Sequence, residues 1–171
     1  MTGRVTPGKP VPAMEVELVG GGSWKLSDQT PESFTLIEVY RGYHCPRCKV
    51  HLLSLGHKIA RFAERGVDVI AVSTDDKERA EKSKAEWGLD LELGYGLDIE
   101  QAREWGLFVS EPIRDTEPNA FAEPGMFLVR PDGTLYSAIM GTTPFHRWNH
   151  ADVLEAVDMI RARDYPPRGT G

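Results

Sequence analysis

The chain is poor in cysteine and has no long hydrophobic run. It contains only two cysteines among 171 residues, so it is not one of the small secreted domains whose fold depends on many disulfides. No apolar run approaches the roughly 20 residues that cross a bilayer. Residues 1–14 also lack the apolar core of a secretory signal. We therefore expect a cytoplasmic protein without a membrane partner.

The chain also lacks a surplus of basic residues. Its formal net charge is -6, and its 20 Lys and Arg residues are interleaved with 26 Asp and Glu residues. Nucleic acids and anionic membranes both bind clustered positive charge. The charge pattern therefore argues against a nucleic-acid partner, and the content of 40% hydrophobic residues is that of an ordinary globular protein.

The length and the two ends of the chain indicate its organisation. A chain of this length fits one domain, so we expect residues 1–171 to form a single domain. Residues 1–12 are rich in Gly, Pro and Thr and are predicted to form a loose N-terminal arm. Residues 164–171 are predicted to form a polar tail.

Between these ends, the apolar pattern predicts alternating strands and helices. The expected strands are 14–19, 34–40, 67–73, 91–94, 126–129 and 134–140. The expected helices are 48–62, 77–87, 98–105 and 150–163. The turn at 131–133 makes the last two strands a hairpin. This order favours an α/β fold with a central mixed β-sheet flanked by helices.

Both cysteines lie in the segment RGYHCPRCKVHL, where a strand leads into a helix. A cysteine at a helix N-terminus is stabilised as a thiolate by free backbone N–H groups, and Cys45 has that position. Cys48 begins the buried stripe of the helix. Pro46 suits the first helical turn, because no needed hydrogen bond is lost there. We predict an exposed, attacking Cys45 and a shielded, resolving Cys48.

The charges near Cys45 support this hypothesis. Arg41 and Arg47 add positive charge, which should lower the pKa of Cys45. Cys45 is therefore expected to alkylate faster than Cys48 near neutral pH.

Two alternatives for the cysteines stay open at this point. His44, His51 and His57 surround them, and two cysteines with two histidines make a zinc set. However, structural zinc sites normally separate two ligand pairs by a loop, whereas these residues follow one another along one helix. The other alternative is a pair of inert buried thiols. We predict a redox pair and no metal.

Two further residues near the pair are candidate helpers. Glu38 lies in a strand that should be covered on both faces, so it must be paired, protonated or functional. It could accept the proton of Cys48, or it could face an edge of the sheet or pair with a Lys or Arg. His44 could share the proton role, or be a solvated neighbour of Cys45. The aromatic and basic loop 142–148 could line the pocket or form an oligomer contact, but we assign it to packing.

The sequence resembles the AhpC/TSA family (alkyl hydroperoxide reductase/thiol-specific antioxidant), a peroxiredoxin-like branch of the thioredoxin-fold superfamily. The resemblance covers about residues 11–160 and is carried by LSD, YRGYHCPRCKVHL, VDVIAVSTDD and EPGMFLVRPDGTLY. It implies a thioredoxin-like fold with the redox C-x-x-C at the N-terminus of the first main helix. It also implies a cis peptide bond at Pro124, packed against the redox pair, although a simple strand-start proline is the alternative.

The resemblance further implies an activity. A reactive cysteine is oxidised by a hydroperoxide to sulfenic acid and recycled through a disulfide by a thiol donor of thioredoxin or glutathione type. Cys45 matches the reactive position and Cys48 the second cysteine. Dimers occur throughout the family, so a homodimer is implied, and no cofactor is expected.

Some positions depart from the family's pattern. In the motif P-x-x-x-T/S-x-x-C, Glu38 and Gly42 occupy the proline and hydroxyl positions. Pro124 stands where the family has an arginine. The pocket is thus closer to that of thioredoxin. A thioredoxin-type protein disulfide oxidoreductase without peroxidase activity and a non-catalytic redox sensor are therefore the alternative functions.

Overall fold

The computed structural model describes residues 4–171 and contains a seven-stranded sheet. The strands are β1 (Glu15–Leu18), β2 (Ser23–Lys25), β3 (Phe34–Val39), β4 (Val67–Val72), β5 (Leu93–Tyr95), β6 (Val109–Ser110), β7 (Phe121–Ala122), β8 (Gly125–Val129) and β9 (Leu135–Met140). The helices are α1 (Pro46–Gly56), α2 (Ile59–Ala63), α3 (Lys77–Trp87), α4 (Ile99–Glu104) and α5 (His150–Arg163), with a short 3-10 turn at Leu26–Asp28.

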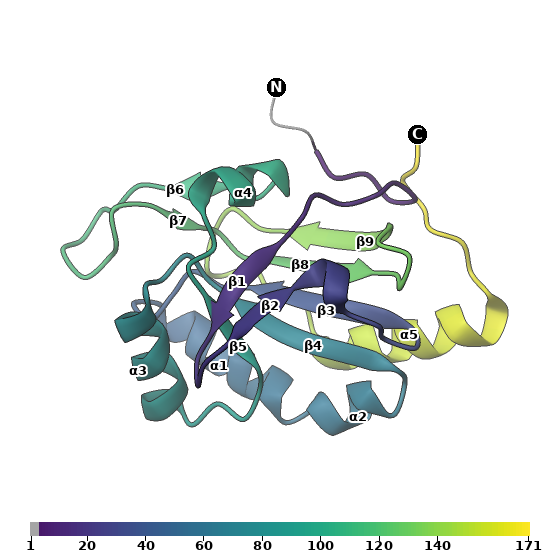
Figure 1. Ribbon diagram of the computed structural model, residues 1–171, viewed down its shortest axis with the longest axis horizontal. Coiled ribbons are helices and arrows are strands. Elements are labelled where there is room, and N and C mark those ends of the chain that lie inside the picture. The colour runs from purple at the N-terminus through teal and green to yellow at the C-terminus, as the bar shows by residue number, and fades with distance from the viewer. Residues whose placement is uncertain (1–3) are drawn as a thin grey trace.

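The order in the sheet is β2-β1-β5-β4-β3-β8-β9 (Figure 1). β3, β4 and β5 run parallel to one another, β8 is antiparallel to β3, and β9 is antiparallel to β8. The predicted mixed sheet, with parallel strands followed by an antiparallel pair, is confirmed. β3 lies at its centre, between β4 and β8, so its six residues are all buried.

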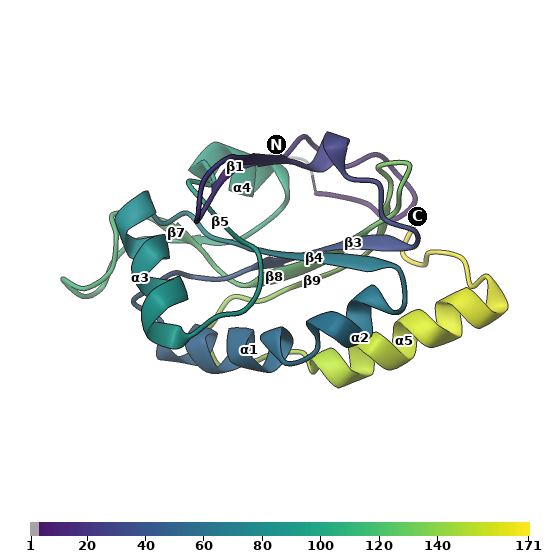
Figure 2. The same cartoon turned by 60° about the horizontal axis from the view of Figure 1, so that its bottom comes forward.

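Helices cover the sheet on both faces. In Figure 2, α1, α2 and α5 lie below the sheet, and α4 lies above it. Side chains alternate along a strand, so Leu36 of β3 belongs to the core under α1 and α5, while Ile37 belongs to the core on the other face, with Trp105. Glu38 has the same parity as Leu36 and therefore faces the α1 and α5 side.

The predicted helix 48–62 is divided into α1 and α2 by a turn at His57 and Lys58. Gly56 is the last residue of α1, and glycine has the lowest helix propensity after proline. The apolar stripe continues across the break, since Leu52, Leu55 and Phe62 all lie in one core. The periodicity therefore identified the buried face correctly but not the interruption.

Residues 4–12 are not the loose arm that we predicted, whereas the prediction for residues 1–3 lies outside the described residues. Gly8 N–H donates to the carbonyl of Leu135 (2.7 Å), and Leu135 N–H donates to the carbonyl of Lys9 (2.9 Å). Val5 is buried. The arm is held because its backbone groups pair with the start of β9.

The polar tail 164–171 follows α5 and returns toward this arm. The Tyr136 hydroxyl donates to the backbone oxygen of Tyr165 (3.0 Å). Thr170 and Pro167 lie beside Gly8. Figure 1 accordingly shows the end of the chain next to the arm.

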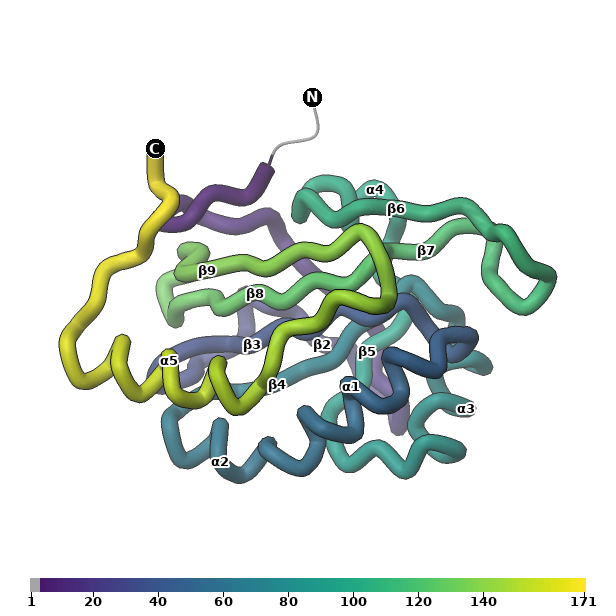
Figure 3. The backbone as a smooth tube through the Cα atoms, turned by 180° about the vertical axis from the view of Figure 1, so that it is seen from behind, coloured from purple at the N-terminus to yellow at the C-terminus, as the bar shows by residue number. Residues whose placement is uncertain are grey.

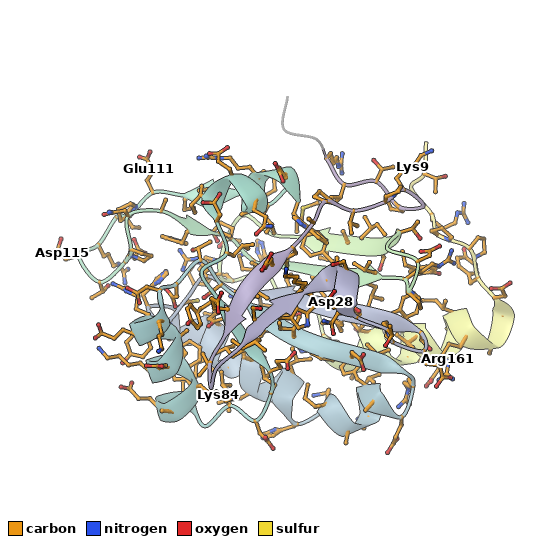
Figure 4. All side chains as sticks on the ribbon, viewed as in Figure 1. Lys9, Asp28, Lys84, Glu111, Asp115 and Arg161 are labelled. Atoms are coloured by element: carbon orange, nitrogen blue, oxygen red, sulfur yellow. The ribbon has the colours of Figure 1, made fainter. Side chains whose placement is uncertain are left out.

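Charged side chains of both signs are spread around the molecule (Figure 4). Those labelled there are Lys9, Asp28, Lys84, Glu111, Asp115 and Arg161. Within residues 4–171, no helix has both the length and the apolar character that crossing a bilayer requires.

Candidate active site

Both cysteines lie at the corner between β3 and α1, as predicted. Cys45 is the N-cap residue of α1 with an extended backbone, and Pro46 is in the first turn. The backbone N–H of Cys48 donates to the Cys45 sulfur (3.2 Å). The sulfur therefore takes the role that a serine or aspartate oxygen has at other helix starts, and one of the free N–H groups of the helix is satisfied.

Cys45 is buried, which corrects the prediction of an exposed thiol. Only 1% of Cys45 and none of Cys48 is accessible. The capping bond turns the Cys45 sulfur inward, toward the first turn of α1. In addition, Arg147 Nη2 lies 3.2 Å from the Cys48 sulfur and 3.9 Å from the Cys45 sulfur. Both thiols are therefore packed against neighbouring groups and have almost no accessible surface.

The two thiols are nevertheless electrostatically unequal. The hydrogen bond from the Cys48 thiol lowers the pKa of Cys45 to about 6; burial opposes this, and the Cys48 N–H and the Arg41 charge support it. Burial raises the pKa of Cys48 well above its ordinary value, and the neighbouring Cys45 adds to that. At neutral pH the site therefore holds a Cys45 thiolate beside a Cys48 thiol.

This inequality predicts the pH dependence of alkylation. With a pKa of about 6, Cys45 should be about 90% ionised at pH 7. The rate of its reaction with iodoacetamide should level off above pH 6 and fall about tenfold per unit below it, because only the thiolate reacts. Mass mapping of the labelled peptide checks this. Faster labelling of Cys48 at pH 7 would contradict the assignment.

The cation that contacts the sulfurs is Arg147, which the sequence did not identify. Arg147 lies in the loop that we assigned to packing, and its Nε donates to the Pro144 carbonyl (2.7 Å), which fixes the guanidinium. Arg47 instead lies over the ring of Phe145, 5.6 Å from its centre. No local motif relates Arg147 to the cysteines, so only the fold reveals it.

Arg41 borders the site as predicted, but its guanidinium group also forms ion pairs with two carboxylates. Its backbone N–H lies 3.4 Å from the Cys48 sulfur. Its Nε lies 3.1 Å from Glu123 Oε2, and its Nη2 lies 4.0 Å from Glu117 Oε1. The acid pair holds the guanidinium over the Phe121 ring, 4.8 Å from its centre. Part of the Arg41 charge is therefore neutralised before it acts on Cys45.

His44 is half-buried, not solvated. Its ring lies 4.6 Å from that of Phe121, measured between centres. Burial first and the Arg41 charge second lower its pKa to about 4. His44 is therefore neutral at pH 7 and a weak base.

Pro124 does not form the cis peptide bond that the resemblance implied. None of the peptide bonds in the described part of the chain is cis. Pro124 precedes β8 directly, and its carbonyl accepts from Gly141 N–H (2.9 Å). It thus agrees with the alternative of a strand-start proline.

Glu38 is fully buried and is paired with histidines, whereas the simple alternative expected a Lys or Arg. Its Oε1 lies 2.8 Å from His51 Nε2, and its Oε2 lies 3.3 Å from His150 Nε2. Trp148 Nε1 donates to Oε2 (3.2 Å). Burial alone would raise the pKa of Glu38, but the contacts with His150 and His51 outweigh it and lower the pKa. Glu38 is therefore an ionised carboxylate and a weak base toward Cys48.

Gly42, at the hydroxyl position of the family motif, cannot hold a side chain. Its φ is +135°, and a Cβ built on it would lie 2.6 Å from Asp75 Oδ1. Asp75 is buried and its Oδ2 accepts from Tyr43 N–H (2.8 Å), which anchors the loop before Cys45. A threonine or serine would displace that anchor. Gly42 therefore follows from the backbone path of this chain.

Substitution of Gly42 tests this steric argument. Gly42→Ala should lower the free energy of unfolding more than Gly96→Ala, by roughly 1–3 kcal/mol, through the added clash. Gly96 is the matched control, because it also has a positive φ but no atom within 4 Å of its Cβ position. Urea denaturation measures both. Equal losses of unfolding free energy in the two variants would show that Asp75 can move aside without destabilising the fold.

Known proteins resemble this chain in family and in fold. The model of the AhpC/TSA family matches residues 7–138. No match was found among curated proteins.

Among solved structures, a mutant of peroxiredoxin 6 from Arenicola marina is 22% identical with a TM-score of 0.75, over 95% of this chain and 80% of that one. The reduced 2-Cys peroxiredoxin of Plasmodium vivax is 16% identical with a TM-score of 0.78, over 94% and 84%. AhpC of Mycobacterium tuberculosis is 14% identical with a TM-score of 0.75, over 99% and 100%. The expected thioredoxin-like fold of the peroxiredoxins is confirmed.

Proposed function

The chain belongs to the AhpC/TSA family and is a peroxiredoxin-like oxidoreductase, and from this premise we propose that it reduces hydroperoxides at Cys45. The Cys45 thiolate attacks the terminal peroxide oxygen, the O–O bond breaks, and the alcohol leaves with one added proton. Cys45 becomes a sulfenic acid. Cys48 then attacks its sulfur, forms the disulfide and releases water. Two external thiols restore the dithiol and become a disulfide themselves.

The single observation that carries this proposal is the inequality of the two thiols. A pKa of about 6 makes Cys45 the nucleophile at neutral pH. The raised pKa of Cys48 keeps its proton until the sulfenic acid forms next to it. The N-cap bond from Cys48 N–H to the Cys45 sulfur brings the two residues into one turn. This order of reactivity supports attack by Cys45 and resolution by Cys48.

In the proposed reaction, two positively charged side chains stabilise the sulfurs. Arg41 favours the Cys45 thiolate, and Arg147 donates to the Cys48 sulfur. Pro46 holds the first turn of α1, where Cys48 donates to Cys45. We assign no chemical step to Arg47, His44, Glu38 or Pro124.

The donor that we propose is a thiol protein of thioredoxin type. The disulfide would lie within one helical turn, and a dithiol donor can attack it and resolve the mixed disulfide on its own. The related structures are peroxiredoxins.

We also propose that the protein is a homodimer and is located in the cytoplasm, as expected from the sequence. Light scattering of the purified chain tests the dimer.

Stopped-flow measurement of peroxide loss tests the function. The reduced protein should consume one equivalent of hydroperoxide much faster than the uncatalysed reaction, and the product should be two mass units lighter than the dithiol. Loss of peroxide at the uncatalysed rate would reject the proposal.

A second candidate is a thioredoxin-type disulfide oxidoreductase, which the missing hydroxyl at Gly42 favours. Peroxide activation depends on donors aimed at its oxygens, and this position supplies none. Turnover of insulin disulfides without peroxide turnover would support this second candidate instead.

A further inference from the structure

A second cluster of reactive side chains lies beneath the redox pair. Glu38 comes from β3, His51 from α1 and His150 from the first turn of α5. Figure 3 shows α1 and α5 in front of the strands, on one face of the sheet. The exposed fractions of the three residues are 0%, 9% and 1%. The fold thus gathers two imidazoles and a carboxylate, 112 residues apart at most, in the core.

The ligand atoms of these residues converge. One ring nitrogen of His51, one ring nitrogen of His150 and one oxygen of Glu38 all lie within 4.8 Å of one another. Zinc binds imidazole nitrogen and carboxylate oxygen at about 2.0–2.2 Å, so ligand atoms around one ion lie roughly 3–3.5 Å apart. The separations of 2.8 Å and 3.3 Å from Glu38 to the two histidines are close to that range. A small ion can therefore be reached by all three with slight adjustment.

The orientation of His51 is the more specific observation. Although its Nε2 lies only 2.8 Å from Glu38 Oε1, neither atom has a hydrogen-bond partner with acceptable alignment. In a hydrogen bond the ring N–H points at the acceptor. Around a metal ion, both lone pairs point at the ion between the two atoms. A short contact without the alignment of a hydrogen bond leaves both atoms free to bind a shared ion.

The charges of the cluster also suit a cation. The Glu38 carboxyl has no exposed surface, and the polar side chains around it are those of His51, His150 and Trp148. A buried carboxylate is costly without a compensating charge. Two imidazoles and one carboxylate are a common set of three protein ligands for zinc. A divalent ion would supply the missing positive charge.

We propose that Glu38, His51 and His150 bind one zinc ion, contrary to the sequence-based expectation of no metal. The cysteines are outside this site, because the metal-binding group found within residues 4–171 contains only these three residues. The ion joins β3, α1 and α5. It thereby holds the helix whose first turn carries Cys45 and Cys48. The site does not depend on the peroxide reaction proposed above.

Calorimetric titration with Zn²⁺ tests the site. The full chain carries Cys45→Ser and Cys48→Ser, so that thiols cannot compete for the ion. We expect one Zn²⁺ per chain and a higher melting temperature with the ion. Co²⁺ in place of Zn²⁺ should give visible absorption bands without thiolate charge transfer, in the double variant and in the reduced wild type alike. A chain that binds no Zn²⁺ would overturn the proposal.

Histidine variants in the same background locate the ion. His51→Ala and His150→Ala should weaken binding by more than roughly 100-fold, because loss of an outer contact alone costs up to that much. The controls His57→Ala and His146→Ala remove exposed histidines and should bind as the parent does. These two exposed positions keep the test decisive if loss of a buried histidine unfolds the chain. Binding that disappears in either control would place the ion elsewhere and reject the site.

Discussion

Replacement of Cys45 by serine is expected to reduce the rate of peroxide consumption by at least about a thousandfold, to the uncatalysed rate. A serine hydroxyl is not ionised at neutral pH, whereas the thiolate is stabilised by the Cys48 thiol and N–H and by Arg41. The substitution hardly changes the volume of the side chain, and serine caps helices well. The fold should therefore persist, so that the loss reports on chemistry. Stopped-flow measurement of peroxide loss gives the rate.

Cys48→Ser is the matched control for this loss. It should consume one equivalent of peroxide in a first turnover and then stop, because the sulfenic acid at Cys45 has no internal partner. Mass measurement should find one added oxygen on the Cys45 peptide. If Cys48→Ser lost the first turnover and Cys45→Ser kept it, the roles of the two residues would be reversed.

The fold could be predicted from the sequence where the pattern is local. The run 34–40 is apolar except for Thr35 and Glu38, and its residues 34–39 form the central strand β3, covered on both faces. The C-x-x-C lies where that strand meets a helix, so the N-cap position of Cys45 and the first-turn position of Pro46 followed from helix geometry alone.

Contacts between distant segments could not be predicted in this way. Arg147, Trp148 and His150 belong to the loop and helix after β9, and they reach Cys48 and Glu38 only once α5 packs beside α1. A sequence pattern identifies which face of a helix or strand is buried, but not which other element packs against that face. The sequence therefore offered only an edge position or a Lys or Arg partner as the structural role of Glu38, whereas its partners are two histidines.

The other differences between the predicted and the observed structure also arise from contacts that the local sequence pattern does not reveal. β6 and β7 were not expected from the sequence; they pair with Val109 opposite Ala122, and strands of two residues leave no periodic signal. The burial of Cys45 depends on where its sulfur points, and this is set by the bond from Cys48 N–H. The place of the C-x-x-C at the junction of a strand and a helix therefore predicted a redox site. The accessibility of its thiols depends on tertiary packing and could not be predicted.

Arg147→Met is expected to slow disulfide formation about 10- to 100-fold and to change the first oxidation much less. A hydrogen bond from a charged group contributes about 1.5–3 kcal/mol, and about 1.4 kcal/mol corresponds to a factor of ten in rate. Arg147 Nη2 lies 3.2 Å from the Cys48 sulfur but 3.9 Å from the Cys45 sulfur. Its charge lowers the pKa of Cys48 against the dominant effect of burial. Without it, Cys48 ionises less readily as it attacks the sulfenic acid.

The measurement is rapid mixing with peroxide, followed by quenching and mass analysis of the Cys45 peptide. The sulfenic acid should accumulate in Arg147→Met, because its formation continues while its resolution is delayed. Arg147→Lys should recover part of the rate, since it keeps the charge but not the fork of the guanidinium. Arg47→Met, next to the cysteines in sequence but directed at Phe145, should resemble the wild type. Equal delays in the two methionine variants would show that general positive charge acts here, and the direct contact between Arg147 and Cys48 would lose its role.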